Sequence, residues 1–272
     1  MGLPFITSRY LRGGQFAAAP AAPAADTGVT RQSDLVLWYK MDEGTGTAVA
    51  DSSGSGFDAA FTGDGATWVT GRDGVRSALA FDGVDDAIVD GASNYDVATA
   101  MNGHMTDNTL QGAFSVSFWT IQPTGGNVGT AHIGSYFKDG NPFMIIRSDY
   151  SGANTRGSLG MLPGPGLLYY IKTDYWEADT EWHHVVYTFN GLADGAGGEW
   201  NAYRNGSLNT TLTGTGGVGW RRPMQNYAEH LWIGDTWSAD AGPHSVEDFR
   251  IYDVELGADD VTAIYAGGDG DY

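Results

Sequence analysis

The segment Ser245–Tyr265 reads SVEDFRIYDVELGADDVTAIY, and its hydrophobic period changes halfway along. In the first half, β-branched and aromatic residues are set among Glu247, Asp248 and Arg250, a pattern typical of a half-buried strand. In the second half, apolar residues recur at helical spacing after the acidic pair Asp259–Asp260, and acids are favourable at the N-terminal end of a helix. We therefore predict a last strand followed by a short C-terminal helix, which together close an all-β domain.

The composition predicts many short strands. The chain has 272 residues, of which 42% are hydrophobic, enough for the core of one large domain or two small ones. Its 41 glycines follow no Gly-X-Y period, which favours many tight turns. There is no cysteine, which excludes disulfides, thiolate metal sites and cysteine catalysis. No apolar run approaches the roughly 20 residues that a membrane-spanning helix needs.

The charge is strongly negative. Asp and Glu number 33 against 14 Lys and Arg, a net charge of −19, and only three residues are lysine. Such a surface repels nucleic acid and anionic membranes, so we expect neither nucleic-acid binding nor membrane insertion. Salt screens the self-repulsion of an acidic surface, and we therefore expect a saline, halophilic setting.

Residues 1–34 differ from the rest and are predicted to form an extended N-terminal arm. Up to residue 32 the arm has three arginines and one aspartate, a net charge of +2, and it contains the low-complexity spacer Ala17–Ala25. Arg9 and Arg12 interrupt the apolar core that a signal peptide would need, so we expect the arm to be retained. Aromatic residues and arginines are enriched in interface cores. We predict that the arm docks onto other subunits through Phe5, Arg9, Tyr10, Arg12 and Phe16.

From residue 35 onward the pattern is that of short strands. The pair Asn205-Gly206 between two such runs predicts a type I′ hairpin. The fold class we predict is all-β: an antiparallel jelly-roll β-sandwich in a single domain over residues 35–272. The predicted strands are Leu35–Gly44, Thr47–Ala50, Ala78–Phe81, Ala87–Val89, Phe114–Ile121, His132–Tyr136, Phe143–Arg147, Ser158–Leu162, Leu167–Lys172, Trp182–Asn190, Glu199–Arg204, Ser207–Thr213, Leu231–Gly234 and Val246–Tyr252.

Eight sequence blocks, taken together and in this order, carry a family resemblance. They are LWYKMDEG (Leu37–Gly44), DSSG (Asp51–Gly54), ALAFDGVDD (Ala78–Asp86), FSVSFW (Phe114–Trp119), WHHVV (Trp182–Val186), YRNG (Tyr203–Gly206), LWIG (Leu231–Gly234) and VEDFRIY (Val246–Tyr252). The chain from about residue 35 to 265 resembles the LamG-like jelly-roll domain of the concanavalin A-like lectin/glucanase superfamily. The resemblance implies a concanavalin A-like fold, which serves adhesion, sugar binding, catalysis and structure in different proteins.

Catalysis is not expected. Glycoside hydrolysis needs two carboxylates about 5–9 Å apart around the bond. The resemblance implies that an enzyme of this superfamily would carry them on one strand as E-x-D-x-E or a close variant, and the sequence has no such triple. The adjacent His183 and His184 should point to opposite faces of a strand, so we interpret them as structural histidines rather than shared metal ligands.

Acidic residues at strand ends suggest a structural Ca²⁺ ion, which prefers oxygen ligands at turns. The resemblance implies an ion near the chain ends, with Asp42, Asp82 and Asp248 as the best candidates. The alternative is that these acids are solvated and cap backbone N–H groups of turns.

Aromatic residues in loop-like segments suggest glycan recognition. The candidates are Trp220, Arg222, Trp237, Tyr175 and Trp176. The alternative is that these aromatic side chains pack on the sandwich or in subunit contacts.

These features together predict a non-enzymatic structural or display protein. The leading hypothesis is a virion component, a capsid decoration, turret or fibre subunit at the surface of an extracellular particle, where the jelly roll could bind host-surface glycans. We also expect a homo-oligomer. The alternative is a secreted or cell-surface carbohydrate-binding or adhesion module, and a third is a glycanase without a recognisable motif.

Overall fold

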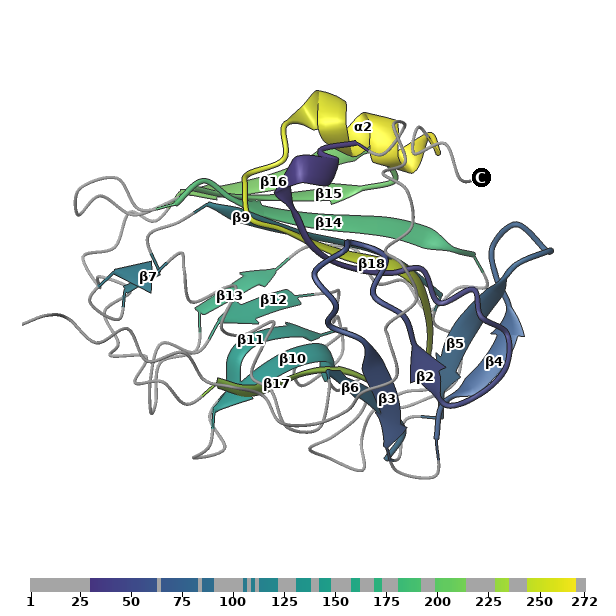
Figure 1. Ribbon diagram of the computed structural model, residues 1–272. Coiled ribbons are helices and arrows are strands. Elements are labelled where there is room, and N and C mark those ends of the chain that lie inside the picture. Colours follow the sequence, from purple (N-terminus) through teal and green to yellow (C-terminus); the bar gives the residue numbers. More distant parts are fainter. Residues whose placement is uncertain are drawn as a thin grey trace, which may run out of the picture.

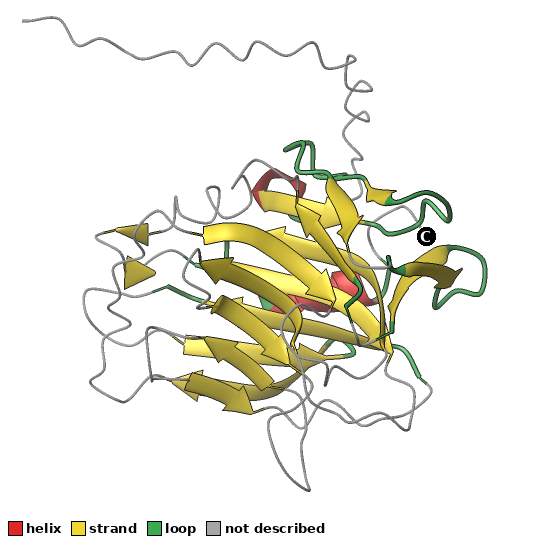
Figure 2. Cartoon of the chain, turned by 90° about the horizontal axis from the view of Figure 1, so that it is seen from below, coloured by secondary structure: helices red, strands yellow, loops and turns green. Residues whose placement is uncertain are grey.

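The computed structural model describes residues 30–62, 65–82, 85–90, 105–106, 109–110, 113–121, 131–137, 142–147, 158–161, 169–172, 181–191, 199–213, 228–234 and 244–267. The predicted arm residues up to 29 lie outside this set. Within it the chain forms two antiparallel sheets, which lie one above the other as two layers (Figure 1, Figure 2). The prediction of an antiparallel sandwich is thereby confirmed.

Sheet 1 contains eight strands, and β18 is at its centre because it pairs with β9, β5 and β1. The order is β16 (Ser207–Thr213), β15 (Glu199–Arg204), β14 (His183–Phe189), β9 (Phe114–Ile121), β18 (His244–Tyr252), β5 (Ser77–Phe81) and β4 (Thr67–Thr70), with β1 (Leu35–Tyr39) also paired to β18. The first strand and the last strand of the chain are therefore neighbours.

Sheet 2 also contains eight strands. The order is β13 (Tyr169–Lys172), β12 (Ser158–Met161), β11 (Pro142–Arg147), β10 (Ala131–Phe137), β17 (Ala228–Gly234), β6 (Ala87–Asp90), β3 (Ala59–Thr62) and β2 (Ala48–Val49). A separate two-stranded ribbon is formed by β7 (Met105–Thr106) and β8 (Thr109–Leu110).

The main core lies between the two sheets and follows from period-2 alternation. Along β9, Phe114, Val116 and Phe118 point inward and are fully buried. They pack with inward residues of sheet 2, among them Ile88 and Ile233. One sheet face buried in this way fixes the strand register, because a slip of one residue would turn every core side chain outward.

A second apolar cluster lies on the opposite, outer face of sheet 1, beneath α2 (Ala258–Tyr265) (Figure 1). Val261 and Ile264 of the helix are fully buried against strand residues, including Val186 and Tyr252. The predicted C-terminal helix is thus present, and it covers the outer face of the sheet. The helix does not cover the whole face, and the uncovered part is where the candidate site lies.

Most predicted strands agree with the structure, but some predictions were wrong. The strand predicted over Leu35–Gly44 ends at Tyr39, because the backbone of Met41 is left-handed, with φ of 60°. The strands β3, β4, β7 and β8 were not predicted. The hairpin at Asn205-Gly206 is confirmed, since both residues have positive φ, 49° and 76°, as a type I′ turn requires. Among the described residues, no helix is long and apolar enough to cross a membrane.

Candidate functional site

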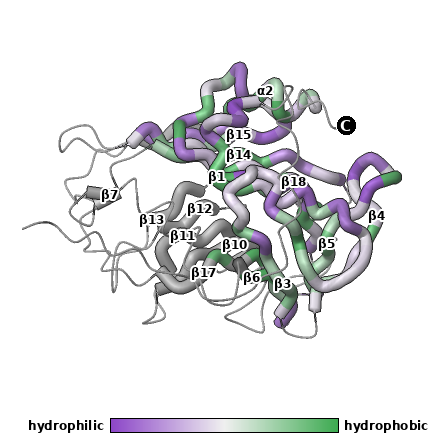
Figure 3. The backbone as a smooth tube through the Cα atoms, in the orientation of Figure 1, coloured by the Kyte–Doolittle hydropathy of each residue, from purple (hydrophilic) through white to green (hydrophobic). Residues whose placement is uncertain are grey.

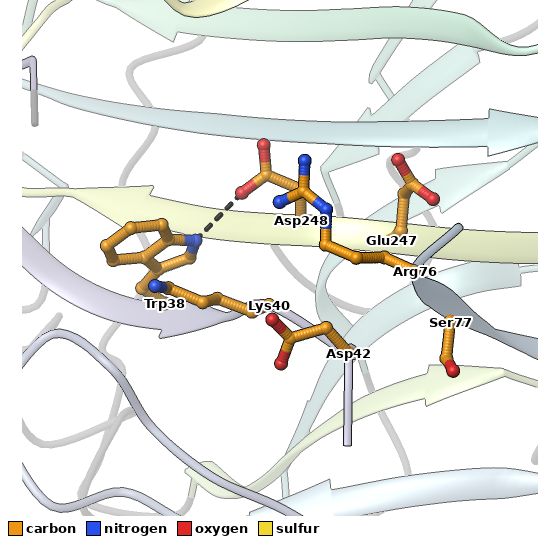
Figure 4. A pocket seen from close by; sticks show the side chains of 7 residues that line it. All are labelled: Trp38, Lys40, Asp42, Arg76, Ser77, Glu247 and Asp248. Carbon is orange, nitrogen blue, oxygen red and sulfur yellow. Dashed lines mark hydrogen bonds between the residues drawn. The ribbon is translucent and has the colours of Figure 1, made fainter. Parts of the chain in front are cut away.

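A small charged pocket lies between the end of β1, the start of β5 and the N-terminal half of β18 (Figure 4). It contains about 310 Å³ of empty space, part of it open solvent, and the centres of water molecules can occupy about 20 Å³ of it. The pocket is therefore shallow, with room inside for a few atoms only. Its lining residues are Trp38, Lys40, Asp42, Arg76, Ser77, Glu247 and Asp248.

The β18 side of the pocket is formed by a β-bulge. The register of β18 against β9 shifts between Glu247 and Arg250, and Asp248 within this interval has φ of 54°. Aspartate tolerates this left-handed conformation better than most residues. The backbone N–H of Asp248 donates to the carbonyl of Lys40 at 3.2 Å, which ties the bulge to the segment after β1. The bulge re-aims two successive acidic side chains toward the pocket.

The β1 side of the pocket uses every second residue of the segment, Trp38, Lys40 and Asp42. The Trp38 indole N–H donates to Asp248 Oδ1 at 2.8 Å. The ammonium group of Lys40 lies 4.4 Å from the Trp38 ring centroid, and the guanidinium carbon of Arg250 lies 4.5 Å from it. Cation–π contacts of this kind fix Trp38, which is only 3% exposed.

Both buried acids of the pocket are paired with arginines. Arg250, which is 0% exposed, donates to Asp248 from Nε at 2.7 Å and from Nη2 at 3.0 Å. Glu247 forms an ion pair with Arg72, with 2.5 Å between Oε1 and Nε, and accepts the backbone N–H of Arg72 at 3.0 Å. Burial raises the pKa of Glu247 above its usual value, while the bonds to Arg72 act in the opposite direction.

The Arg72–Glu247 pair depends on a close approach at the loop between β4 and β5. A Cβ atom on Gly71 would lie 2.3 Å from Glu247 Oε2, so only glycine allows the carboxylate to lie against this backbone. The loop is largely hydrophilic (Figure 3). Asp73 organises it by accepting the backbone N–H groups of Val75 and Arg76 and the Nε–H of Arg76, each at 2.8 Å. These bonds lower the pKa of Asp73 to about 2.

An aromatic stack links the pocket to the helix. The guanidinium carbon of Arg72 lies 4.0 Å from the centroid of the Trp119 ring. The centroid of the Trp119 ring in turn lies 5.1 Å from that of His184 and 5.5 Å from that of Tyr265 in α2. His184 is fully buried and shares a hydrogen bond of 2.9 Å with the Ser117 hydroxyl. Burial lowers the pKa of His184 to about 3, so the ring is neutral near pH 7. These contacts agree with the interpretation of His184 as a structural histidine.

The three carboxylates of the pocket differ in what they can do chemically. Glu247 is 6% exposed and Asp248 is 4% exposed, and both bind arginines, whereas Asp42 is exposed. A glycosidase needs two carboxylates that both reach the substrate. The described pocket offers one exposed carboxylate together with a lysine, an arginine and a serine, a set suited to hydrogen bonding with a polar ligand.

The structure does not bring all three predicted calcium ligands to one place. Asp42 and Asp248 line the pocket, and Asp248 is bonded to Arg250 and Trp38, while Asp82 follows β5. Among the described residues, one group of acids has oxygens within 4.8 Å of one another, and it consists of Asp82, Asp85 and Asp86. Oxygens at this separation fit the first shell of a Ca²⁺ ion, whose bonds to oxygen are about 2.3–2.6 Å long. Asp82 is thus the one predicted ligand that lies in an acidic cluster.

The other predicted site residues lie outside the described part of the chain. They are the glycan-binding candidates Trp220, Arg222, Trp237, Tyr175 and Trp176, and the arm residues Phe5, Arg9, Tyr10, Arg12 and Phe16. Sequence reasoning missed five pocket residues, which are Trp38, Lys40, Arg76, Ser77 and Glu247. The alternation of Trp38, Lys40 and Asp42 was a usable signal, because it places three polar or amphipathic side chains on one face.

Several solved structures share the fold. The binding domain of botulinum neurotoxin DC, solved in complex with rat synaptotagmin II, has a TM-score of 0.61 and 15% identity, with 87% of this chain and 52% of that chain covered. The binding domain of Paraclostridial Mosquitocidal Protein 1 has a TM-score of 0.61 and 14% identity, with 87% and 52% covered. The chain thus spans about half the length of these toxin binding domains.

A third structure corresponds to a whole domain. Domain 4 of an extracellular arabinanase from Geobacillus stearothermophilus, solved in complex with arabinotriose, has a TM-score of 0.59 and 18% identity, with 85% of this chain and 98% of that chain covered. A search of curated protein sequences gives no match. The sequence model described as the concanavalin A-like lectin/glucanases superfamily matches residues 90–262, well over half of the chain. This chain therefore belongs to the concanavalin A-like lectin/glucanases superfamily.

Proposed function

We propose that this chain is a non-enzymatic, lectin-like binding module that recognises glycans on an extracellular surface. The observation that carries the proposal is the agreement with the arabinanase domain, which matches over 98% of its length and whose structure holds arabinotriose. A second related structure bears a title on cell entry of botulinum neurotoxin type C and its interaction with two ganglioside molecules. Glycan recognition is therefore a use that this fold supports in other proteins.

The architecture suits such a role on physical grounds. Binding residues are commonly placed on loops that connect the elements of a rigid scaffold, and a two-layer sandwich is such a scaffold. The described pocket combines the exposed Asp42 and the half-buried Lys40 and Ser77 with ion pairs that fix its floor. A fixed polar surface loses little conformational entropy when it binds a hydroxyl-rich ligand.

The absence of turnover is part of the proposal. Glu247 and Asp248 are bound to arginines, which leaves Asp42 as the exposed acid of the described pocket. An enzyme of the glycanase type would need a second carboxylate on the other side of the bond. Incubation with the glycans that bind should therefore release no reducing ends.

The test is isothermal titration calorimetry of the full chain with glycans selected on an array. The variants Trp220→Ala and Trp237→Ala examine the aromatic residues predicted from sequence, with Trp68→Ala on β4 as a control outside that predicted set. Saturable binding that is reduced in the first two variants supports the proposal with these residues as the platform. Binding to no glycan overturns it.

A second candidate function is display on a particle, and the composition of the arm favours it. The arm is basic and carries aromatic residues, whereas the body is strongly acidic. The first described residues after it contact the helix, since Arg31 Nε lies 3.3 Å from Asp260 Oδ2. We propose that the arm docks the chain onto other subunits, as in a virion component, and that the jelly roll is displayed outward in a saline medium.

Limited proteolysis of the arm tests this second function. Protection of residues 1–26 in native material, together with rapid cleavage in the isolated chain, supports docking onto another subunit. Equal protection in both samples means that the arm packs on its own domain and removes the main support for a particle role. Deletion of residues 1–26 should abolish incorporation into particles while glycan binding is retained.

A further inference from the structure

We propose that Glu199, Asn201, Thr188 and Glu255 form a calcium site on the outer face of sheet 1, away from the pocket described above. The first two residues lie on β15, Thr188 lies on β14, and Glu255 lies in the loop between β18 and α2. None of them is among the calcium ligands predicted from sequence. The inference goes beyond glycan recognition and does not depend on it.

The strand register places three of these side chains next to one another. On β15, Trp200 and Ala202 enter the main core, so the alternate residues Glu199 and Asn201 point to the outer face. Thr188 of β14 is directly opposite Asn201 and therefore lies on the same face. Side chains directly opposite each other in antiparallel strands have Cβ atoms about 4.5–5.5 Å apart.

The loop that carries Glu255 is fixed against the same face. The Ser115 hydroxyl of β9 donates to the Val254 carbonyl at 2.8 Å and accepts the backbone N–H of Leu256 at 2.9 Å. Ser115 is directly opposite Thr188 in the pairing of β9 with β14. Glu255, which lies between the two anchored residues, is therefore held close to Thr188.

The backbone of Glu199 is fixed as well. Its N–H donates to Asn190 Oδ1 at 2.7 Å, and the N–H of Asn190 donates to the Glu199 carbonyl at 3.1 Å. Both glutamates thus extend from anchored backbone. Ligands that are positioned in advance need little reorganisation when an ion binds.

One amide group joins the two carboxylates. Asn201 Nδ2 donates to Glu199 Oε1 at 3.2 Å, and the Asn201 side chain also hydrogen-bonds to Glu255. Two oxygens bonded to one nitrogen lie about 6 Å apart or less. Burial raises the pKa of Glu255, and the negative charge of Glu199 raises it further. The structure therefore brings two like charges together.

No cationic side chain in the described ranges neutralises this pair, since neither Glu199 nor Glu255 forms an ion pair there. By contrast, Glu247 and Asp248 of the same sheet are each paired with an arginine. Both glutamates of the unpaired set are half-buried, and partial removal from water strengthens the repulsion between like charges. A bound metal ion would supply the missing positive charge.

A buried hydroxyl gives an independent indication of a ligand. Thr188 is 0% exposed, and its Oγ1 atom has no hydrogen-bond partner in the part of the chain that the structure describes. Buried polar groups nearly always have a partner, and an ion or an ordered water molecule commonly explains an exception. Beside Asn201, this oxygen is placed to bind the ion or one of its water molecules.

The donor atoms select calcium. The carboxylates of Glu199 and Glu255, the Thr188 hydroxyl and, after rotation of its amide, Oδ1 of Asn201 are all oxygen ligands. Ca²⁺ takes about six to eight oxygens, including bidentate carboxylates and water, whereas Zn²⁺ prefers nitrogen and sulfur. An ion in this place would join the loop before α2 to β15, and it would help to hold the helix on the sheet.

Terbium luminescence tests the site directly, because Tb³⁺ occupies calcium sites and is excited by energy transfer from nearby aromatic rings. Tyr203 lies close to the pair, since burial raises the pKa of its phenol and the charges of Glu255 and Glu199 raise it further. In the full chain, we expect saturable Tb³⁺ emission on excitation of the aromatic residues. CaCl₂ should displace it at constant ionic strength.

Calorimetry with CaCl₂ measures the contribution of each residue after metal has been removed with EDTA. Glu199→Gln and Glu255→Gln should each weaken binding by about tenfold or more, because loss of a group that merely supports a metal ligand costs about 10–100-fold. Thr188→Val should weaken binding severalfold. The matched control is Glu181→Gln, which changes an exposed glutamate just before β14 and should bind calcium as the parent does.

Melting temperatures in EDTA separate loss of the site from loss of the fold. Without metal, Glu199→Gln and Glu255→Gln should melt at or above the parent, because the repulsion between the two carboxylates is relieved. Thr188→Val should do the same, because it removes a buried hydroxyl that lacks a partner. With calcium, the parent should melt above all three variants.

Each other outcome overturns the inference. The ion is absent if the parent binds no CaCl₂, and it lies elsewhere if both glutamine variants bind as tightly as the parent. Binding lost in Asp82→Asn and retained in Glu255→Gln would assign the ion to the cluster of Asp82, Asp85 and Asp86. Equal weakening in Glu181→Gln would mean general attraction to a chain of net charge −19. None of these measurements involves a glycan, so their failure leaves the proposed function standing.

Discussion

The guanidinium of Arg250 donates two hydrogen bonds to the carboxylate of Asp248, from Nε at 2.7 Å and from Nη2 at 3.0 Å. The two residues are two positions apart on the central strand of sheet 1, and both are buried. The left-handed backbone of Asp248 directs its carboxylate toward Trp38, whose indole N–H donates a hydrogen bond to the same carboxylate. This pair therefore joins the bulge of β18 to β1 and forms the floor of the pocket.

Removal of the negative charge from this pair should destabilise the fold. Asp248→Asn keeps a residue type that tolerates the left-handed backbone, but it leaves Arg250 as a buried cation without its carboxylate. Breaking a buried ion pair in this way costs about 3–5 kcal/mol in the free energy of unfolding. Urea unfolding monitored by circular dichroism measures the change.

The matched control for this variant is Asp42→Asn, which changes an exposed acid of the same pocket. Its free energy of unfolding should stay within about 0.5 kcal/mol of the parent value. A loss below about 1 kcal/mol for Asp248→Asn would contradict the role of the Asp248–Arg250 pair.

Stability should fall on mild acidification because of His184. Its folded-state pKa, lowered by burial to about 3, is below the ordinary value of 6.5, so the unfolded chain takes up the proton first. The contribution of the neutral His184 ring to the free energy of unfolding is fully present above pH 6.5. It is lost progressively as the pH falls toward 3. Between pH 7 and pH 5 the loss from this residue should be about 2 kcal/mol.

The variant His184→Gln isolates this contribution. It should be less stable than the parent at pH 7, because the stack with Trp119 and Tyr265 is lost. Between pH 7 and pH 5, the free energy of unfolding of His184→Gln should fall by about 2 kcal/mol less than that of the parent. The control His230→Gln replaces a histidine of β17 in sheet 2. Identical pH slopes for the parent and His184→Gln would show that the buried ring does not cause the loss.

The structural calcium ion stays a prediction. The structure indicates that it should be tested at a different set of residues from the one predicted from sequence. Solvated acids at turns are common without an ion, so the cluster of Asp82, Asp85 and Asp86 needs a direct experiment. If Ca²⁺ binds there, chelation with EDTA should lower the melting temperature of the parent chain. Asp82→Asn should weaken that response, whereas Asp42→Asn should retain it in full. An unchanged melting temperature, with no metal found by elemental analysis, would refute the prediction.

The fold was predictable from sequence where the alternation is regular. The bounds of β9 were predicted correctly from FSVSFWTI, because Phe114, Val116 and Phe118 recur at every second position and enter the core. The interval of three between Val246 and Phe249 breaks this alternation, and it corresponds to the bulge at Asp248. We interpreted that segment as a regular strand, although the irregular spacing was visible in the sequence.

The pocket could be predicted only in part. Trp38, Lys40 and Asp42 belong to one local pattern, but Arg76 and Glu247 reach them through the pairing of β5 and β1 with β18. Such long-range pairings are not encoded by any local spacing. The early end of β1 could not be predicted either, because methionine, which adopts the left-handed conformation at position 41, is not a residue type that signals a turn.

The most direct test of the central claim is a glycan array probed with the full chain at high and low salt, followed by an assay for reducing ends with every glycan that binds. The account predicts saturable binding to at least one glycan class, with no release of reducing ends. A silent array would contradict the glycan-binding function. Release of reducing ends would contradict the non-enzymatic function.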